Sequence, residues 1–348
     1  AGALLAVKFT GILVFPLTFA GIISAKNRKR FILNYCVFFV SAWLVFFLLN
    51  IHTWFGPWNE LCFYFGTALG RFDFARISTA YFGKIYGSQL PWSHPFVMFA
   101  ITIPAITLFS ALAGLVRGVQ KLKAPACFFE CVSFLMLMFI FSLPFTPKHD
   151  GIRLFSMVWP FIILLAVRGI ATAAQFLSRC TQDVSRGMPP RRRATLFRSL
   201  LLTACCMVSL TGIIRYHPYE LSYYNRIAGG AGGAQKLGFT VSYWYEALNR
   251  DMFRLIETKA VKRPVSLYSI PNQDILEQNR KLGLVPDSLL TADCIETADY
   301  ILVLNRIMTP ALMEVVEQTR PVILISRDNG LIIGLFENPT TAGAGISP

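Results

Sequence analysis

The stretch SLPFTPKHDGIRLF, residues 142–155, places four ionisable side chains in one short turn between two apolar segments. They are Lys148, His149, Asp150 and Arg153. An arginine presents a planar fork of donors that suits phosphate, and a lysine presents a point charge. Together with His149, these two cations could hold a phosphate at the level of lipid headgroups, and Asp150 could accept a sugar hydroxyl or orient Arg153. A solvated turn with snorkelling cations is the plainer alternative.

Another cation lies inside the first apolar run of the chain. Lys8 is near the outer end of GALLAVKFTGILVFP, residues 2–16, where a lysine can snorkel to the interface. The alternative is that Lys8 binds the same anionic group as the turn at 148–153. Spacing alone leaves both interpretations open.

Aromatic and amide side chains dominate residues 215–248, which read RYHPYELSYYNRIAGGAGGAQKLGFTVSYWYEAL. Aromatic rings stack on sugar faces, and amide and hydroxyl groups form hydrogen bonds with sugar hydroxyls. The candidates for binding a sugar or an acceptor in this segment are Tyr223, Tyr224, Asn225 and Trp244. Packing between a membrane domain and the tail explains the same composition equally well.

The elements that must position these residues follow from composition. Hydrophobic residues make up 54% of the 348 residues and charged residues 15%, whereas a soluble domain has roughly 25% charged residues. A spanning helix needs roughly 20 mainly apolar residues. The runs that approach this length cover about 3–23, 31–51, 95–116, 126–145, 154–174 and 197–214. We therefore expect a polytopic α-helical membrane domain over residues 1–214, with about six spans.

The net charge of +14 is spread over alternate connectors. The basic connectors are SAKNRKR at 24–30, RGVQKLK at 117–123 and a longer one at 175–198. The positive-inside rule places such connectors in the cytoplasm, so the first span runs inward and the tail from residue 215 lies outside. A nucleic-acid-binding protein would gather its basic residues on one folded face, so we expect no nucleic-acid partner.

The tail at 215–348 has the composition of a soluble α/β domain. Helical patterns mark 242–260, NQDILEQNRKLGL and PALMEVVEQ, and strand patterns mark RPVSLYS, ADYILVLN, RPVILIS and GLIIGLF. The turn DNG between the last two strands predicts a hairpin. Strands that alternate with helices predict a small α/β domain. No glycine-rich phosphate loop follows a strand, which argues against nucleotide binding.

The connector at 52–94 is long and rich in aromatic residues. Aromatic rings favour the membrane interface, and long loops without regular structure are uncommon unless they are functional. We expect short helices that lie on the outer membrane face.

Cysteine and histidine spacing predicts no metal centre. CxxC and HExxH motifs are absent, so the sequence requires no cofactor, and no residue pattern supports a divalent metal. Cys62 and Cys294 would both face outward, and a disulfide between them is an open alternative. The sequence starts within a hydrophobic run and without an initiator methionine, so we expect it to be part of a longer chain.

Several segments, in this order, resemble the membrane glycosyltransferases of the protein O-mannosyltransferase and aminoarabinose transferase type, glycosyltransferase family 39, which have the GT-C fold. They are GALLAVKFTGILVFP, YFGKIYGSQLPWSHPFVM, PKHDGIRLFSMVWPFIILLA and HPYELSYYNRIAGGAGGA followed by SYWYEAL. The resemblance covers about residues 1–250 and continues weakly into the tail. The second segment adds Trp92 and His94 to the candidates for sugar or acceptor binding.

The resemblance implies that a sugar moves, with inversion, from a polyprenyl-phosphate-linked donor to an acceptor on the outer membrane face. Fixed cations would stabilise the charge that develops on the leaving lipid phosphate. The residues implied in this role are Lys8, Lys148, His149 and Arg153. The family's catalytic carboxylate lies in the first outer loop, upstream of residue 1, so no acid here is assigned as the catalytic base. The family pattern also has glycine where Tyr245 stands.

Two other classes of protein stay open: a lipid or polysaccharide transporter or flippase, and a membrane scaffold with an outer binding domain. A transporter favours charges near mid-bilayer, whereas the charges considered above lie near the ends of the spans. We therefore expect a multi-pass enzyme of the cell or inner membrane with an extracytoplasmic domain at 215–348. Without the upstream carboxylate, general-base help of roughly 10²–10⁴-fold is lost, so we expect these residues alone to be inactive in transfer.

Overall fold

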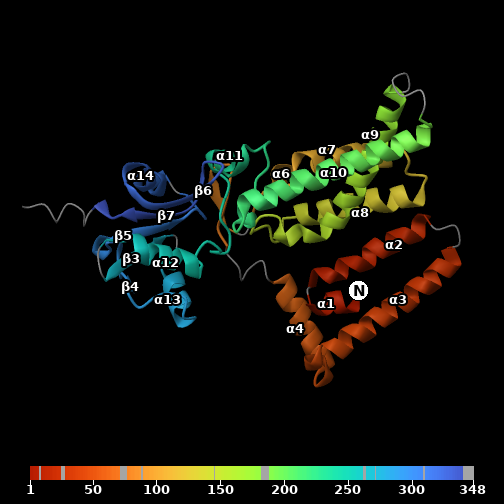
Figure 1. The fold of residues 1–348 in the computed structure, drawn as a ribbon. Helices are drawn as coiled ribbons and strands as arrows, with labels where there is room; N and C mark the ends of the chain where they lie inside the picture. The colour runs from red at the N-terminus through yellow and green to blue at the C-terminus, as the bar shows by residue number, and fades with distance from the viewer. Residues whose placement is uncertain are drawn as a thin grey trace, which may run out of the picture.

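The computed structural model describes residues 1–7, 9–24, 28–70, 77–87, 89–144, 146–181, 188–261, 264–270, 272–308 and 310–339. A helical part is followed by a sheet-containing domain (Figure 1). The helices of the first part are α1 (Gly2–Val7), η1 (Phe9–Leu13), α2 (Val14–Ser24), α3 (Arg28–Leu49), η2 (Ile51–Trp54), α4 (Pro57–Leu69), α6 (His94–Thr102), α7 (Ala105–Val119), α8 (Pro125–Ser142), η3 (Arg153–Val158), α9 (Trp159–Cys180) and α10 (Pro190–Tyr216).

Among the described residues, four helical segments are long and apolar enough to cross a membrane, judged by length and composition. They are Lys29–Leu49, Pro125–Ser142, Arg153–Cys180 and Pro190–Tyr216. These segments coincide with four of the runs that the sequence predicts to be spans. The chain therefore has the helices of a membrane protein.

The two other predicted spans are broken into shorter helices. The run at 3–23 divides into α1, η1 and α2, and the run at 95–116 divides into α6 and α7. Pro104 separates α6 from α7, because a proline has no backbone N–H and its ring clashes with the preceding helical turn. In both regions a single continuous helix was the wrong expectation.

Helices α7 and α9 approach each other closely through two glycines. A Cβ atom added to Gly114 would collide with the carbonyl of Leu165, and one added to Gly169 would collide with the carbonyl of Ser110. Small residues at a crossing let two backbones come together, which is how helices pack when lipid offers no hydrophobic drive. This crossing holds α9, which follows η3, in a fixed position.

An ion pair joins two of the candidate spans. Arg168 of α9 donates two hydrogen bonds to Oε2 of Glu130 in α8, at 2.8 Å from Nε and 2.6 Å from Nη2. The expectation that charges lie near the ends of the spans is therefore incomplete, because both residues are inside membrane-type helices. An isolated charge at this depth is costly, and pairing offsets that cost.

The carboxyl-terminal domain is built on a five-stranded sheet with the order β4-β3-β5-β7-β6. Its strands are β3 (Val265–Ile270), β4 (Leu289–Thr291), β5 (Tyr300–Leu304), β6 (Pro321–Arg327) and β7 (Gly330–Glu337). Strand β3 runs parallel to β4 and β5, and β7 runs antiparallel to β5 and β6. The central strand β5 is buried at every position, as its run of apolar residues predicts. The predicted DNG hairpin is confirmed, with positive φ at Asp328 and Asn329.

The helices of this domain agree only in part with the sequence patterns. They are η4 (Glu220–Ser222), α11 (Gly230–Lys236), α12 (Arg250–Lys259), α13 (Asp274–Lys281), η5 (Ile295–Thr297) and α14 (Pro310–Gln318). The helix predicted at 242–260 begins only at Arg250, because the side chain of Asn249 accepts a hydrogen bond from the Met252 N–H and caps the helix there.

The connector at 52–94 contains more than the expected short helices. Besides η2 and α4, it forms a hairpin of β1 (Thr79–Tyr81) and β2 (Lys84–Tyr86). The hairpin bonds to the tail through its backbone: Gly83 N–H donates to the Gly238 carbonyl at 3.0 Å, and Thr240 N–H donates to the Ala80 carbonyl at 3.3 Å. The connector therefore packs against the tail domain.

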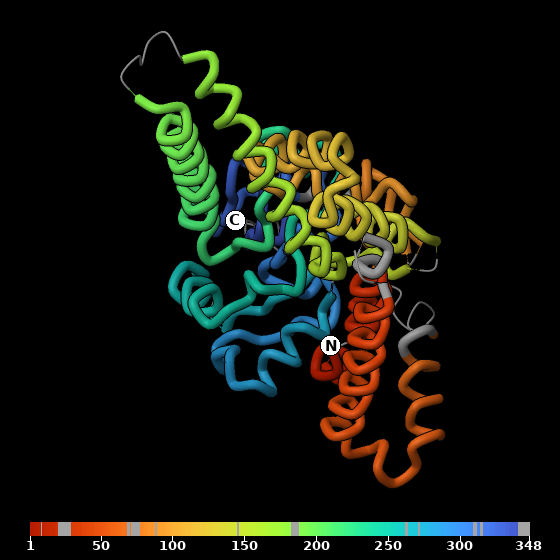
Figure 2. Tube along the Cα trace, turned by 90° about the vertical axis from the view of Figure 1, so that its right-hand side faces the viewer, coloured from red at the N-terminus to blue at the C-terminus, as the bar shows by residue number. Residues whose placement is uncertain are grey.

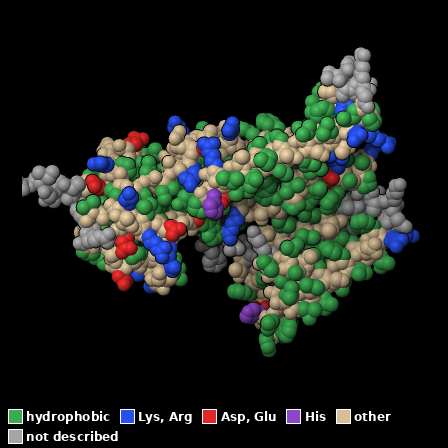
Figure 3. Space-filling model, viewed as in Figure 1, with side chains coloured by type: hydrophobic (Ala, Val, Ile, Leu, Met, Phe, Trp, Pro, Cys, Tyr) green, Lys and Arg blue, Asp and Glu red, His purple; other side chains and the backbone are tan. Residues whose placement is uncertain are grey.

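The two parts meet at one end of the helical bundle, and the described basic residues of the connectors lie toward the other end (Figures 1 and 3). Figures 1 and 2 show α1 to α4 as a group beside the bundle of α6 to α10. Figure 3 shows hydrophobic side chains along the bundle and blue basic side chains at its end far from the sheet. All eight cysteines are free thiols, so Cys62 and Cys294 form no disulfide here.

Candidate functional site

The turn between α8 and η3 bends through two residues with positive φ, 56° at Asp150 and 64° at Gly151. A Cβ at Gly151 would also lie 3.4 Å from the ring of Tyr243. Glycine therefore suits this position twice, because it tolerates the left-handed conformation and leaves room for the ring. The turn is packed directly against the segment that leads into the α/β domain.

Lys148 is in the interior of the protein. Only 1% of the residue is exposed, and Nζ donates a hydrogen bond to the Leu143 carbonyl at 2.6 Å. Burial lowers the pKa of this ammonium, because its charged form is poorly solvated. The side chain braces the turn, and its predicted contact with a lipid phosphate stays a prediction.

Asp150 lies between a histidine and an arginine. Its Oδ2 is 3.9 Å from His149 Nε2, and its Oδ1 is 3.9 Å from Arg306 Nη2. Arg306 lies in the turn that follows β5, so this contact joins the bundle to the α/β domain. The sequence suggested Arg153 as a partner that Asp150 could orient, whereas the structure places Asp150 next to His149 and Arg306.

Arg153 is stacked on an aromatic ring of the exit segment, which is the stretch at 217–249 between α10 and α12. Its guanidinium carbon is 3.9 Å from the ring centroid of Trp244. Arg306 makes a second contact of this kind, 5.2 Å from the ring centroid of Tyr245. Such cation–π pairs fix the plane of a guanidinium, and its N–H donors at the edge stay free to bind an anion.

Tyr243 and Tyr224 form a buried pair of hydroxyls behind these rings. The two Oη atoms are 2.9 Å apart, and Tyr224 Oη donates to the Thr240 carbonyl at 2.5 Å. Burial raises the pKa of both phenols well above the ordinary range. Tyr224 therefore holds the exit segment in place, and its predicted contact with a sugar stays untested.

Glu246 is the residue of this region that sequence reasoning missed. Its Oε1 accepts a hydrogen bond from the Tyr243 N–H at 3.4 Å, and its Oε2 is buried without a partner among the described residues. Burial raises the pKa of the carboxyl to about 7. The sequence signal that could have identified Glu246 is an acid directly after three aromatic residues. Arg306 was missed as well, and its signal is a cation just past a predicted buried strand.

The imidazole of His94 is buried. The residue is 1% exposed, and its Nδ1 has no hydrogen-bond partner among the described residues. Its ring packs between Tyr81 and Phe155, with centroids 5.2 and 5.9 Å away.

Asn225 uses its whole amide to tie the exit segment to α6. Its Nδ2 donates to the carbonyls of Ala100 and Ile103 at 2.7 and 2.6 Å. Its Oδ1 accepts from the N–H groups of Ile227 and Ala228 at 2.9 and 3.2 Å. Such a saturated buried amide is typical of a structural residue, and its predicted role in sugar binding stays a prediction.

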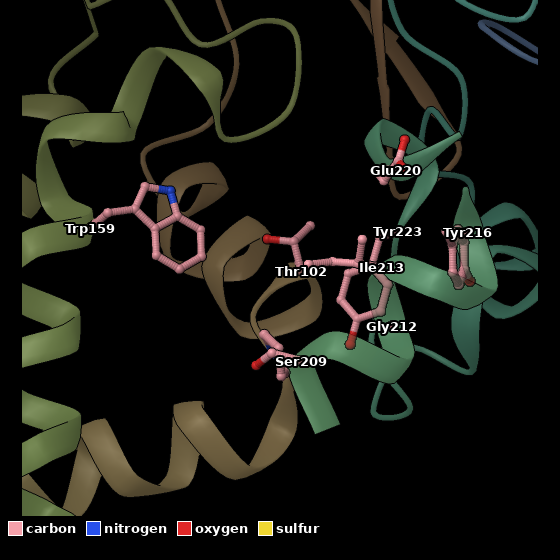
Figure 4. A pocket seen from close by; sticks show the side chains of 9 residues that line it. Thr102, Trp159, Ser209, Gly212, Ile213, Tyr216, Glu220 and Tyr223 are labelled. Atoms are coloured by element: carbon pink, nitrogen blue, oxygen red, sulfur yellow. The ribbon is translucent and has the colours of Figure 1, made fainter. Parts of the chain in front are cut away.

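The other candidates lie elsewhere. Trp92 is largely exposed, with its ring at 6.2 Å from that of Phe96. Tyr223 lines an apolar cavity of about 290 Å³ with Trp159, between the end of α10 and the starts of α7 and α9 (Figure 4). Lys8 is outside the described residues.

The structure thus brings together Asp150 and Arg153 of the turn with Trp244, Glu246 and Arg306 of the tail. Guanidinium groups can bind a phosphate, rings can stack, and carboxylates can orient or deprotonate a hydroxyl. No group of three or more histidine, cysteine or acidic residues suited to a metal occurs among the described residues. Comparisons with protein-family models, curated proteins and solved structures find no match for this chain.

Proposed function

We propose that this chain is a membrane glycosyltransferase that moves a sugar from a polyprenyl-phosphate-linked donor to an acceptor on the extracytoplasmic face. The observation that supports it best is the packing of the turn at 148–153 against Trp244 and Arg306. This packing gathers cations, rings and carboxylates where the apolar helices end and the α/β domain begins. A lipid donor would bring its phosphate to that level of the membrane.

The proposed reaction uses these groups as follows. The oxygen of the acceptor hydroxyl bonds to the anomeric carbon, and the bond from that carbon to the phosphate oxygen breaks. The electron pair stays on the phosphate, where Arg153 and Arg306 would stabilise the charge. The hydroxyl proton passes to a carboxylate that acts as a general base, a role that the resemblance to the GT-C family gives to an acid of that family's first outer loop. Asp150 and Glu246 would orient the acceptor.

We also propose that the chain crosses the membrane six times, with the broken pairs α1–α2 and α6–α7 as the two additional crossings. The basic connectors at one end of the bundle and the α/β domain at the other support this topology (Figure 3). Cysteines introduced at the exposed Leu282 and at Lys121, in a background without other exposed cysteines, test it. Leu282→Cys should react with an impermeant reagent from outside only, and Lys121→Cys from inside only. The reverse labelling would overturn the orientation.

A photoreactive polyprenyl-phosphate sugar tests the function itself. Cross-links are expected in peptides that contain Arg153 or Trp244, and unlabelled polyprenyl phosphate should compete whereas polyprenol should not. Cross-links that polyprenol removes equally well would show that only the hydrocarbon is recognised. That result would contradict a site built for phosphate.

A lipid transporter is the second candidate, because the Glu130–Arg168 pair puts charges inside the candidate spans. Proteoliposomes with a fluorescent polyprenyl-phosphate sugar separate the two functions. Movement of intact donor between leaflets, lost in a variant without the ion pair, would favour transport. Donor binding without such movement would favour the transferase.

A further inference from the structure

A second cavity of about 290 Å³ lies between α7, α8 and α9, where the basic connectors gather. Arg117 and Lys121 line it from the end of α7 and the connector that follows, and Arg168 lines it from α9. Glu130 and Thr172 contribute further polar groups. The turn at 148–153 does not line this cavity, so a ligand bound here is separate from the proposed donor.

The cavity carries a positive charge that no neighbouring acid neutralises. Glu130 is engaged by Arg168 through both of the hydrogen bonds described above. Within the described part of the chain, no carboxylate lies at ion-pair distance from Arg117 or Lys121. The recorded side-chain bond of Arg117 goes to the neutral Gln120, at 3.0 Å. A partly enclosed group of cations attracts an anion.

Stabilisation of the α7 dipole accounts for only part of this arrangement. Cations near a helix carboxyl end are favourable, which explains Arg117 and Lys121. It does not apply to Arg168, which lies well inside α9, is held by Glu130 and lines the same cavity. Charges from separate helices that meet at one hollow are typical of a binding site.

The walls of the cavity identify the kind of anion. Leu164 and Val167 line it and are each 44% exposed, and the nearby Val116 is 60% exposed. These side chains belong to membrane-type helices and would face lipid. The ligand that fits therefore joins an anionic group to hydrocarbon chains.

We propose that this cavity binds the phosphate of an anionic phospholipid, in the leaflet opposite the α/β domain. The guanidinium of Arg117 and the ammonium of Lys121 hold phosphate oxygens, and acyl chains lie along Leu164 and Val167. Basic pockets between membrane helices near a cytoplasmic surface recognise lipid headgroups through this chemistry. The bound lipid would fix the register of α7 against α9.

Native mass spectrometry of the purified protein, titrated with phosphatidylglycerol, phosphatidylcholine or inorganic phosphate, tests the proposal. Phosphatidylglycerol should bind more tightly than either of the others. The double variant R117Q/K121Q should weaken its binding by about 10–30-fold, as expected for two basic residues at a membrane surface. The near-isosteric Gln175→Glu, at an exposed position of the same cavity, should also weaken it without disturbing the fold.

The matched control is K123Q/R179Q, which removes the same charge from exposed residues that do not line the cavity. It should bind phosphatidylglycerol like the parent protein. Equal loss in both double variants would show non-specific attraction and overturn the site. Inorganic phosphate that binds as tightly as phosphatidylglycerol would overturn the assignment to a lipid, as would equal binding of phosphatidylcholine.

Discussion

The guanidinium carbon of Arg153 lies 3.9 Å from the ring centroid of Trp244, so a charge at the start of η3 is held by a ring of the exit segment. The two residues are far apart in sequence, and they join the bundle to the α/β domain. Because the ring covers one face of the guanidinium, the donors at its edge point in a fixed plane. That plane is what a phosphate needs for a bidentate contact.

Trp244→Leu is expected to weaken donor binding by about 3–30-fold, because a cation–π contact of this kind contributes about 0.5–2 kcal/mol. Trp244→Phe keeps an aromatic ring, so its affinity for the donor should lie between those of the parent protein and Trp244→Leu. Binding of a radiolabelled polyprenyl-phosphate sugar measures the effect. Trp58→Leu is the control, since Trp58 is 75% exposed on α4. Equal losses at Trp58 and Trp244 would contradict a specific role for the stacked ring.

The carboxyl of Glu246 should make stability depend on pH. Its pKa is raised to about 7 from 4.5 by burial, so the folded state keeps a proton that the unfolded state releases within that window. Stability therefore falls as pH rises from about 4.5 to about 7, by on the order of 3 kcal/mol in total. Glu246→Gln should remove this fall.

Thermal unfolding at about pH 5 and about pH 8 checks the prediction for Glu246. The stability of Glu246→Gln minus that of the parent should be larger at about pH 8 than at about pH 5. Glu296→Gln, at an exposed position of the same domain, is the matched control. A parent protein that is no less stable at the higher pH than at the lower would refute the assignment.

Tyr224→Phe should destabilise the protein by about 1–3 kcal/mol, because it leaves the Thr240 carbonyl and the Tyr243 hydroxyl without a buried partner. Tyr223→Phe is the matched control, since the Tyr223 hydroxyl forms no recorded hydrogen bond with any residue that the structure describes. Thermal unfolding of both variants measures the difference. A larger loss at Tyr223 than at Tyr224 would contradict the account of the exit segment.

Gly169→Leu should separate α7 from α9 and cost about 1–3 kcal/mol or more, because its side chain would meet the Ser110 carbonyl. Gly66→Ala, at a helical position of α4 with open space around it, should be neutral or slightly stabilising. Folded yield and thermal unfolding in detergent measure both changes. Full stability of Gly169→Leu would show that the helices do not cross as described.

Local patterns were enough to predict much of the fold. The charge-free run at 31–51 forms most of α3, because a long apolar run is compatible with few structures other than a helix. The DNG turn joins β6 to β7, because this turn sequence strongly favours a hairpin. The break at Pro104 could have been predicted from the same rules, since proline ends helices. The glycine-rich helix α11 could not be predicted from local patterns. Its glycines allow close packing, because a Cβ at Gly230 or Gly232 would collide with Asp328.

The candidate site was predictable only where its residues are consecutive in sequence. The turn at 148–153 is visible as a cluster of charges, but its partners in the tail depend on the tertiary fold. Arg306 meets Asp150 because β5 ends beside the turn, and no spacing rule relates positions that far apart. The burial of Lys148 could not be predicted from the sequence either. A lysine is usually an exposed cation, but the fold buries this one and its Nζ bonds to the Leu143 carbonyl.

The affinity of the purified protein for a polyprenyl-phosphate sugar, compared among Arg153 variants, tests the proposed function most directly. Arg153→Ala and Arg153→Lys should both weaken binding by about 10–100-fold, because hydrogen bonds to a charged phosphate are lost and a point charge does not replace a fork. Arg254→Ala, which removes an exposed arginine of α12, should bind like the parent. Unchanged affinity in both Arg153 variants, or an equal loss in Arg254→Ala, would contradict the account.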